Sequence, residues 1–384
     1  MNNSLHKELV LTRVTEQNLT SGIEDEYGVL YSEDGEILLK CKSRKLETYS
    51  IKFGTKVICN NAFHSCSLLK QVIIPDSVIS VGDCAFAFCH SLHSINLPNS
   101  VISIGDCAFV GCQSLHKITI PHAVTSIRFR SFLGCESLQQ IIIPNSVTNI
   151  GNETFCRCRS LRQIIIPKSV TSIGNGVFTE CDNLEVICDS KQFVFVNSML
   201  IDKQKGILLS YNGNKSDIVI PDFVTNIGDK AFDKCKSLQQ ITIPNSVTNI
   251  GFGAFSECSS LQQINIPNTV TSIGNWAFYE CNSLPQIIIP NSVTSIGDAA
   301  FSDCKSLKQF IIPDSITRIG NQTFERCRSM RQIFIPDSVT SIGDWAFSDC
   351  PSLQQIIIPE GSTEKFKKMF DEELWDKLYE SESL

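Results

Sequence analysis

Hydrophobic and polar positions along most of the chain follow a pattern that repeats every 23 residues. The unit reads Leu-x-x-Ile-x-Ile-Pro-x-x-Val-x-x-Ile-Gly-x-x-Ala-Phe-x-x-Cys-x-x. Its proline recurs in two series, at Pro75, Pro98, Pro121, Pro144 and Pro167, and at Pro221, Pro244, Pro267, Pro290, Pro313, Pro336 and Pro359. A fixed period of this length is typical of a solenoid, in which each unit forms one coil and neighbouring coils bury one another's apolar side.

The first part of each unit predicts a short β-strand. Ile141 and Ile143 lie two residues apart, which places both on one buried face, and Pro144 ends the strand because it has no N–H to donate. Gly151 suits a tight turn, and Phe155 anchors a short helical or irregular segment that closes the coil. Equivalent strands of neighbouring coils are then expected to pair in parallel, about 4.8 Å apart.

This unit resembles the BspA-like type of leucine-rich repeat, which has Ile-Pro after the strand and Ala-Phe-x-x-Cys on the return side. The resemblance covers about residues 49–360. It implies an α/β-type repeat solenoid, a right-handed leucine-rich repeat arc with a concave parallel β-sheet. Members of that family are often described as adhesins or interaction proteins, although function transfers between family members less reliably than fold.

Two segments fall outside the period and resemble each other. Residues 29–39 and 199–209 each read as two apolar strands around a polar turn that contains glycine, which predicts a β-hairpin. The hairpins align at an offset of 170 residues and the coils that follow them at 169. Thr154 and Thr323, which alone among the threonines precede a repeat phenylalanine, are also 169 apart. We infer an internal duplication of one hairpin plus six coils, with independent drift of similar repeats as the alternative.

The predicted organisation has three parts. An N-terminal segment with a hairpin cap covers 1–48, about twelve coils cover 49–360 with a hairpin insert near 189–217, and a C-terminal helical cap covers 361–384. Caps are expected because an open solenoid exposes an unpaired strand edge at each end. Residues 1–22 are polar and expected to be loose. The helix is predicted from Glu364 to Tyr379, with an apolar stripe of Phe366, Met369, Phe370, Leu374, Trp375 and Leu378. A membrane-surface or partner-binding helix would carry a similar stripe.

Composition narrows the possible functions. Hydrophobic residues make up 42% of the chain and charged residues 19%, which is typical of a folded protein and excludes global disorder. The net charge of -7 argues against binding of nucleic acid by bulk charge. No apolar run is long enough for a membrane span, and residues 1–16 do not read as a secretory signal.

Twelve of the 18 cysteines occupy one position of the repeat. They are Cys66, Cys89, Cys112, Cys135, Cys158, Cys181, Cys235, Cys258, Cys281, Cys304, Cys327 and Cys350. One such residue per coil predicts a ladder of small buried thiols; disulfides are the alternative, disfavoured because equivalent side chains point the same way. Cys84 and Cys107 are the best candidates for an oxidation-prone pair.

The many free thiols and the lack of a secretory signal favour a cytoplasmic location. The cell surface of an anaerobe is the alternative.

No pattern predicts an enzyme or a cofactor site. Gly251 and Gly253 lack the third glycine of a nucleotide loop, and no catalytic motif occurs. Asp83, Asp106 and Asp344 share a repeat position that reads as a variable surface site. The stacked His93 and His116, with His122 nearby, suggest exposed polar residues rather than a weak metal site, because no carboxylate repeats beside them at ligand spacing. Two arginine clusters predict a solvated face or a docking spot for an acidic partner: Arg128, Arg130, Arg157, Arg159 and Arg162, and Arg326, Arg328 and Arg331.

The outward positions of the strands are the best candidate for binding. In the second half of the chain they form an uncharged surface with an apolar row, Ile288, Ile311, Phe334 and Ile357, flanked by Gln286, Gln309, Gln332 and Gln355. Such a strip often marks a protein contact site, but stacked side chains also stabilise neighbouring strands. The expected function is a non-enzymatic scaffold that binds an unidentified protein partner through the concave sheet. A surface adhesin, a carbohydrate-binding module and an enzyme are the alternatives. The sequence does not predict the oligomeric state.

Overall fold

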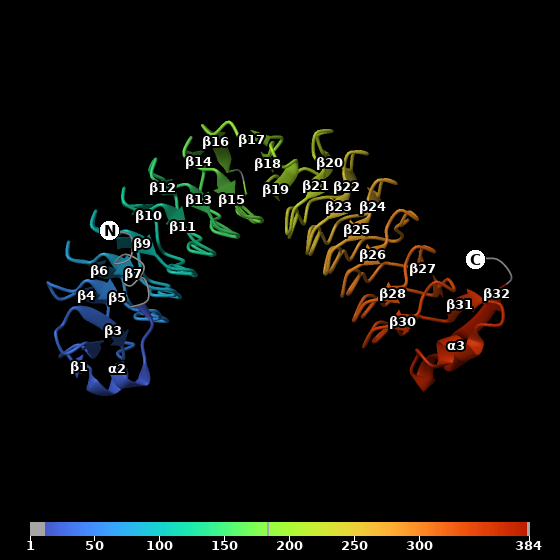
Figure 1. Ribbon diagram of the computed structural model, residues 1–384, viewed down its shortest axis with the longest axis horizontal. Helices are drawn as coiled ribbons and strands as arrows, with labels where there is room; N and C mark the ends of the chain where they lie inside the picture. Colours follow the sequence, from blue (N-terminus) through green and yellow to red (C-terminus); the bar gives the residue numbers. More distant parts are fainter. Residues whose placement is uncertain (1–11, 183, 382–384) are drawn as a thin grey trace, which may run out of the picture. The chain divides into compact units, whose positions relative to one another are not determined.

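The computed structural model describes residues 12–182 and 184–381 and divides into two compact units, Met1–Ser198 and Met199–Leu384. Within each unit the chain winds into stacked coils, with equivalent segments of neighbouring coils side by side (Figure 1). Most coils contribute two short parallel strands, one at the position before the repeat proline and one at the position before the repeat glycine. The predicted leucine-rich solenoid of 23-residue coils is therefore confirmed, and it contains two sheets where the sequence predicted one.

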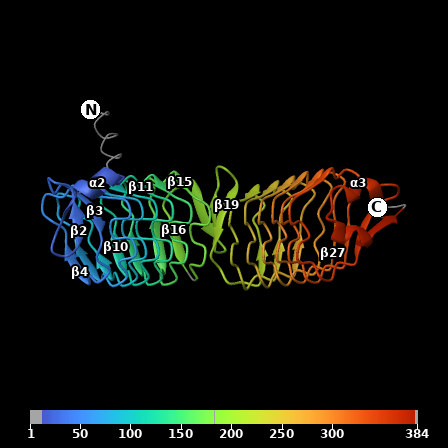
Figure 2. The same cartoon turned by 90° about the horizontal axis from the view of Figure 1, so that it is seen from below.

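We call these two surfaces the proline-side sheet and the glycine-side sheet. In unit 1 the proline-side strands are β4 (Thr48–Ser50), β6 (Gln71–Ile73), β8 (Ser94–Ile95), β10 (Lys117–Thr119), β12 (Gln140–Ile142), β14 (Gln163–Ile166) and β16 (Glu185–Cys188). The glycine-side strands are β5 (Val57–Ile58), β7 (Ser80–Val81), β9 (Ser103–Ile104), β11 (Ser126–Ile127), β13 (Asn149–Ile150) and β15 (Ser172–Ile173), and β17 (Phe193–Val196) ends the unit. Figure 2 shows β4, β10 and β16 on one side of the unit and β11 and β15 on the other.

Unit 2 repeats this plan. Its proline-side strands are β20 (Asp217–Val219), β22 (Gln240–Thr242), β24 (Gln263–Asn265), β27 (Gln309–Ile311), β29 (Gln332–Phe334) and β31 (Gln355–Pro359). Its glycine-side strands are β21 (Asn226–Ile227), β23 (Asn249–Ile250), β25 (Ser272–Ile273), β26 (Ser295–Ile296), β28 (Arg318–Ile319) and β30 (Ser341–Ile342). Pairing is in register, so that Ile311 faces Phe334 and Phe334 faces Ile357.

Stacked phenylalanine rings form the centre of each unit. One stack runs from Phe63 to Phe178 and the other from Phe232 to Phe347, with ring centroids 5.2–5.9 Å apart and planes within 2–14° of parallel. The rings are buried, which confirms that the repeat phenylalanine anchors the core. Tyr49 packs against the first ring of one stack and Tyr211 against the first ring of the other.

The repeat glycine has a different role from the one predicted. Gly151 does not adopt a left-handed backbone; instead, a Cβ atom at this position would lie 2.6 Å from the backbone nitrogen of Phe129 in the preceding coil. Glycine is therefore required because neighbouring coils approach closely here, and not because of a tight turn.

The left-handed conformation occurs elsewhere in the coil. Two positions per coil, around the repeat phenylalanine, have positive φ, and most carry side chains: Lys230 and Glu257 have φ of 56° and 55°. This segment consists of successive turns rather than a helix.

The residues after the repeat glycine were predicted to form a variable surface site. In the structure their side chains instead form a ladder of hydrogen bonds between neighbouring coils. The side-chain oxygen of Asp83 accepts a hydrogen bond from the backbone N–H of Asp106 at 2.8 Å, and that of Asn321 accepts from the N–H of Asp344 at 3.0 Å. Asn and Asp recur there because a short side-chain oxygen can reach the N–H of the next coil.

Both predicted hairpins are present and have the same register. The strands β2 (Val29–Tyr31) and β3 (Ile37–Cys41) pair antiparallel with a bulge after Leu30, and β18 (Met199–Asp202) and β19 (Ile207–Tyr211) pair with a bulge after Leu200. Each hairpin continues the glycine-side sheet, because β3 pairs with β5 and β19 with β21. Before the first hairpin, the strand β1 (Ile23–Glu24) pairs with β2.

The expectation of a loose N-terminus is wrong for residues 12–22, which are the part of residues 1–22 that the structure describes. Residues Glu16–Ser21 form the helix α2, which starts at a capping box between Thr15 and Asn18. The side-chain and backbone hydrogen bonds of that box satisfy N–H groups that would otherwise fray. The rest of that prediction, at residues 1–11, lies outside the described residues.

The C-terminal cap is not the single helix that was predicted. The chain forms a short helix α3 (Thr363–Lys367), a 3-10 helix η2 (Glu372–Lys377) and a final strand β32 (Leu378–Ser381). Phe366 and Phe370 of the predicted stripe are buried, and Phe370 packs against Phe347 at the end of the ring stack. β32 pairs in parallel with β31. A continuous helix would cover the apolar end of the coil but leave the N–H and C=O groups of that edge strand unpaired.

Candidate functional site

The predicted contact row lies on the proline-side sheet of unit 2 with its side chains outward. Ile288 and Ile311 are 79% and 59% exposed, whereas Phe334 and Ile357 are half-buried. The residues on either side of each row member point inward, since Ile333, Ile335, Ile356 and Ile358 are all buried. The alternation of the strand therefore turns the row residue outward on β27, β29 and β31.

The first row member does not lie on a strand. Residues 286–288 have no regular secondary structure, and the proline-side sheet of unit 2 is split there, into β20, β22 and β24 on one side and β27, β29, β31 and β32 on the other. The cause is Pro285, which replaces a residue whose N–H donates to the preceding coil elsewhere, as Gln262 donates to Gln239 at 2.9 Å. The expectation of four adjacent strands is therefore wrong at Ile288.

The row extends beyond the predicted set at its other end. β32 places Tyr379 opposite Ile357, and Tyr379 is 48% exposed. Sequence reasoning missed it because the segment was predicted to be helical, and Leu378-Tyr379-Glu380-Ser381 shows no alternation that would have signalled a strand. The flanking amides are partly satisfied by one another, because the Gln332 amide nitrogen donates to the Gln355 side-chain oxygen.

Unit 1 has a shorter apolar run at the same repeat position. Ile142, Ile165 and Ile187, on β12, β14 and β16, are 47%, 48% and 37% exposed. A hollow of about 390 Å³ covers part of this run and is lined by residues that include Arg162 and Asp189. Further hollows lie over β6, β8 and β10 and beside Tyr49. The sequence prediction placed the apolar surface only in the second half of the chain.

The repeat cysteines form the predicted ladder of buried thiols, with Cys235 half-buried. In ten of the described coils the thiol donates to the carbonyl oxygen of the repeat phenylalanine in the preceding coil, as Cys281 donates to Phe255 and Cys304 to Phe278, at 3.2 and 3.1 Å. All 18 cysteines are free. Burial raises the pKa of the Cys135 and Cys304 thiols to about 12 in each case. A buried, protonated thiol reacts slowly, so these groups are structural.

Cys84 and Cys107, the predicted oxidation-prone pair, are half-buried in adjacent coils. Burial is the main cause that raises the pKa of the Cys107 thiol to about 11, and the neighbouring Cys84 thiol is the second cause.

The stacked His93 and His116 rings lie 6.0 Å apart. Among residues 12–182 and 184–381, no group of three or more histidine, cysteine or acidic side chains is placed to hold a metal ion.

In the described part of the chain, four arginines of the two clusters form ion pairs with acidic residues of adjacent coils. Arg130 makes a bidentate contact to Glu153, and Arg157 and Arg159 share Glu180 at 2.7 and 2.6 Å. In unit 2, Arg326 lies near Asp303 and Asp349 at 3.5 and 3.6 Å. These ion pairs cancel much of the positive charge that an acidic partner would recognise.

Comparison with known proteins identifies the family. The model for the BspA type leucine-rich repeat region, in six copies, matches residues 45–185, 209–331 and 294–375. The chain belongs to the BspA type leucine-rich repeat family. This assignment confirms the resemblance read from the repeat unit, and proteins built from leucine-rich repeats are generally non-enzymatic scaffolds for protein interaction or for cell-surface roles.

Solved structures give the same result. A leucine-rich cell surface protein from Faecalibacterium prausnitzii is 28% identical, with a TM-score of 0.65, over 90% of this chain and 96% of that one. A leucine-rich repeat protein from Bacteroides ovatus is 28% identical, with a TM-score of 0.53, over 94% and 97%. The pneumococcal vaccine antigen PcpA shares the fold at 18% identity and a TM-score of 0.66, over 94% and 97%. No match was found among curated proteins.

These relatives do not support the cytoplasmic placement and fit the cell-surface alternative. Within the described residues, no helix is both long and apolar enough to cross a membrane.

Proposed function

We propose that this protein is a non-enzymatic scaffold that binds a protein partner through the outward row on the proline-side sheet of unit 2. The row consists of Ile288, Ile311, Phe334 and Ile357, flanked by Gln286, Gln309, Gln332 and Gln355, and we add Tyr379 to it. The observation that supports this most is the exposure of large apolar groups at Ile288 and at Ile311 on β27, on a surface where solvent favours polar residues.

The chemistry of the row defines the kind of contact. Phe334 is the proposed anchor, because aromatic side chains contribute a large share of binding energy. The flanking amides supply hydrogen-bond donors and acceptors at the rim. Because neither group is charged, binding should depend little on ionic strength. We further propose that the partner is met at a bacterial cell surface, on the analogy of the F. prausnitzii relative.

A single substitution with a matched control tests the row. Ile311→Ser removes an apolar group that is 59% exposed, and Ile73→Ser removes one at the same repeat position in unit 1 that is 58% exposed. Both variants should keep the unfolding midpoint of the parent protein. A photoactivatable cross-linking residue at position 334, used on intact cells, identifies the partner.

With that partner in hand, Ile311→Ser should weaken binding about tenfold or more, and Phe334→Ser about thirtyfold, while Ile73→Ser leaves it unchanged. Equal effects of Ile311→Ser and Ile73→Ser on binding would reject the row. A loss of stability in Ile311→Ser without a loss of binding would make the row a structural ladder.

An adhesin for host or matrix proteins is the second candidate, favoured by the same cell-surface relative. It predicts that antibodies to the protein label intact cells and that the purified protein binds immobilised matrix proteins. Labelling only after lysis would reject both the adhesin and the surface placement. The scaffold proposal would then still be tested by the substitutions in the row.

A further inference from the structure

The last coil of unit 2 ends in a set of backbone donors that no further coil uses. In each preceding coil, three alternate N–H groups around the repeat phenylalanine donate to carbonyl oxygens of the next coil. In one coil these bonds run from Trp276, Phe278 and Glu280 to Asp298, Ala300 and Ser302, at 2.9, 2.8 and 3.0 Å. In the coil before last they run from Gln322, Phe324 and Arg326 to Asp344, Ala346 and Ser348, each at 2.9 Å.

The equivalent donors of the last coil are the N–H groups of Trp345, Phe347 and Asp349. Within the described part of the chain, none of the three has a hydrogen-bond acceptor. Phe347 is only 6% exposed, so its N–H also has limited access to water. Buried N–H groups are nearly always paired, and an unpaired series of them at the end of a sheet or coil readily pairs with an added chain.

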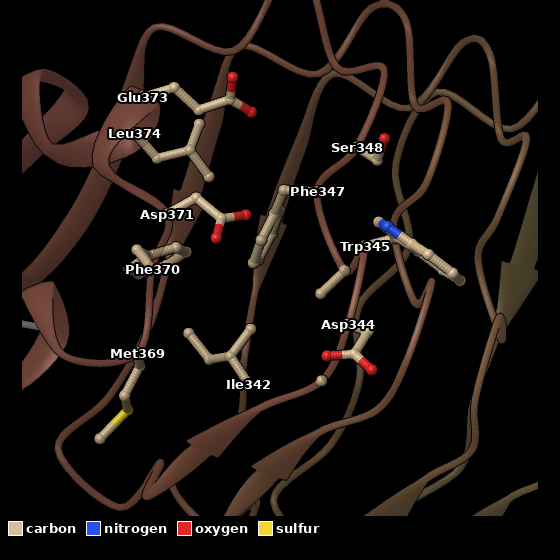
Figure 3. A pocket seen from close by; sticks show the side chains of 12 residues that line it. Ile342, Asp344, Trp345, Phe347, Ser348, Met369, Phe370, Asp371, Glu373 and Leu374 are labelled. Carbon is tan, nitrogen blue, oxygen red and sulfur yellow. The ribbon is translucent and has the colours of Figure 1, made fainter.

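A cavity of about 440 Å³ lies against this edge. The cap segment from Met369 to Leu374 borders this space. Its Phe370 ring packs on Phe347, with the ring centroids 5.6 Å apart, but no carbonyl oxygen of the segment, which the structure describes in full, accepts from the three N–H groups. Figure 3 shows the ring of Phe347 in the centre, with Asp371 and Glu373 on the cap side and Asp344 and Trp345 on the coil side. The space therefore lies beside the Phe347–Phe370 contact, against the backbone of the last coil.

The charged residues that line the cavity are all acidic. Asp344, Asp371 and Glu373 line it, and its twelve lining residues include no lysine, arginine or histidine. In the coil before, the side-chain oxygen of Asn321 accepts from the N–H of Asp344, so the carboxylate of Asp344 occupies the position that would accept from the next coil. The exposed ring of Trp345 adds an aromatic face, which attracts cations.

We propose that this cavity is a binding site for an extended, basic peptide segment of a partner protein, which pairs with the free N–H groups of the last coil. The carbonyl groups of such a segment pair with the three free N–H groups, as in the addition of a strand to a sheet edge. A lysine or arginine side chain meets Asp344, Asp371 and Glu373. The site lies apart from the proline-side row, so the failure of one proposal would not affect the other.

The test uses the full chain and short synthetic peptides. The probe is the acetylated, amidated pentapeptide Ser-Lys-Ser-Lys-Ser, and Ser-Glu-Ser-Glu-Ser is its acidic counterpart. Asp371→Asn combined with Glu373→Gln removes two charges from the cavity, and Glu372→Gln removes a neighbouring charge that does not line it. All of these changes lie on exposed side chains and should not affect folding. Binding is measured by calorimetry, and amide exchange is measured by mass spectrometry for the segment 345–349.

We expect the lysine peptide to bind and to slow amide exchange in 345–349. The double variant should weaken binding about tenfold, as the loss of two exposed charge pairs predicts, and Glu372→Gln should have no effect. Equal binding of the acidic peptide, or binding without protection of these amides, would overturn the proposal. Self-association of the free protein that disappears in the double variant, without peptide binding, would assign the cavity to a second copy instead.

Discussion

At the scale of single residues, the recurrent side chains are explained by contacts to the neighbouring coil. The thiol of Cys281 reaches the carbonyl oxygen of Phe255, and the side chain of Asn321 reaches the N–H of Asp344. The burial of the cysteines could be predicted from their spacing, because an apolar group once per coil must face the core. The role of the Asn and Asp residues could not, because a single coil gives no sign of which polar group the next coil brings near.

Two kinds of glycine in the repeat should respond differently to alanine. At Gly151 a Cβ would lie 2.6 Å from the Phe129 nitrogen, so Gly151→Ala should force two coils apart and cost about 3 kcal/mol. At Gly134, which has a φ of +74°, the nearest atom would be 3.6 Å away, and Gly134→Ala should cost only about 1 kcal/mol of backbone strain. Urea unfolding of the two variants measures the difference, and similar losses would contradict this account of the repeat glycine.

Asp233 should make the protein less stable as the pH rises from about 4 to about 6. Burial raises the pKa of this carboxyl from 3.8 to about 6, so the folded state holds the proton more tightly than the unfolded state. The cost of burying the charge is absent below the unfolded pKa and fully present above the folded one. Asp233→Asn should therefore stabilise the protein by about 2 kcal/mol at pH 7 and have little effect at pH 4.

Asp229→Asn is the matched control for that charge change. The Asp229 side chain accepts from the N–H of Phe252, and the equivalent position in other coils carries asparagine, as at Asn275. Its effect on the unfolding midpoint should be small at both pH values. A pH profile of unfolding that is the same for Asp233→Asn and the parent protein would show that Asp233 is not the group responsible.

At the scale of elements, the helices and strands that could be predicted are those whose sequence pattern lies within the element itself. Each hairpin has two apolar strands around a polar turn, and each strand before a proline has its own alternation. The C-terminal cap was mispredicted because its stripe fits a helix, whereas the outcome depends on the free edge of β31, which no local pattern of the cap segment indicates. The glycine-side strands were missed because two residues such as Asn149–Ile150 are too short to show alternation.

Restoring an N–H at position 285 should join the two halves of the proline-side sheet of unit 2. Pro285→Gln allows this residue to donate to Gln262 in the preceding coil, as Gln262 itself donates to Gln239. Amide exchange of 286–288 should become slower, while the gain in stability stays within about 1 kcal/mol, because proline also restricts the unfolded chain. Pro351→Gln, at a proline outside the strands, is the control, and unchanged exchange at 286–288 would refute the explanation given for the break.

At the scale of the molecule, each unit is a linear stack in which a coil contacts mainly its neighbours. Contacts of this kind make stability approximately a sum of coil and interface contributions. The identical register and bulge position of the two hairpins support the proposal that the units arose by duplication, because independent drift would not be expected to place an extra residue at Leu30 and at Leu200.

Damage to one ring of a stack should therefore spread along its own unit. Phe255→Ala removes a ring that contacts Phe232 and Phe278 and should cost about 3–5 kcal/mol. Cys258 and Cys281 are buried, so their alkylation should be slow in the parent protein and should accelerate strongly in the variant, while Cys112 in unit 1 reacts at its original rate. Mass spectrometry of the alkylated peptides separates these sites, and unchanged labelling of Cys258 would contradict the assigned core.

The close similarity of the coils has a consequence for the gene. Recombination between two near-identical repeats removes or adds a whole coil, keeps the reading frame and joins surfaces that already fit. The length of the solenoid can thus change between strains in steps of one coil without a new fold having to evolve. The end coil is different, because its edge meets a dedicated cap, so we expect variation in coil number to fall inside each stack and to spare the segment from Ser341 to the C-terminus.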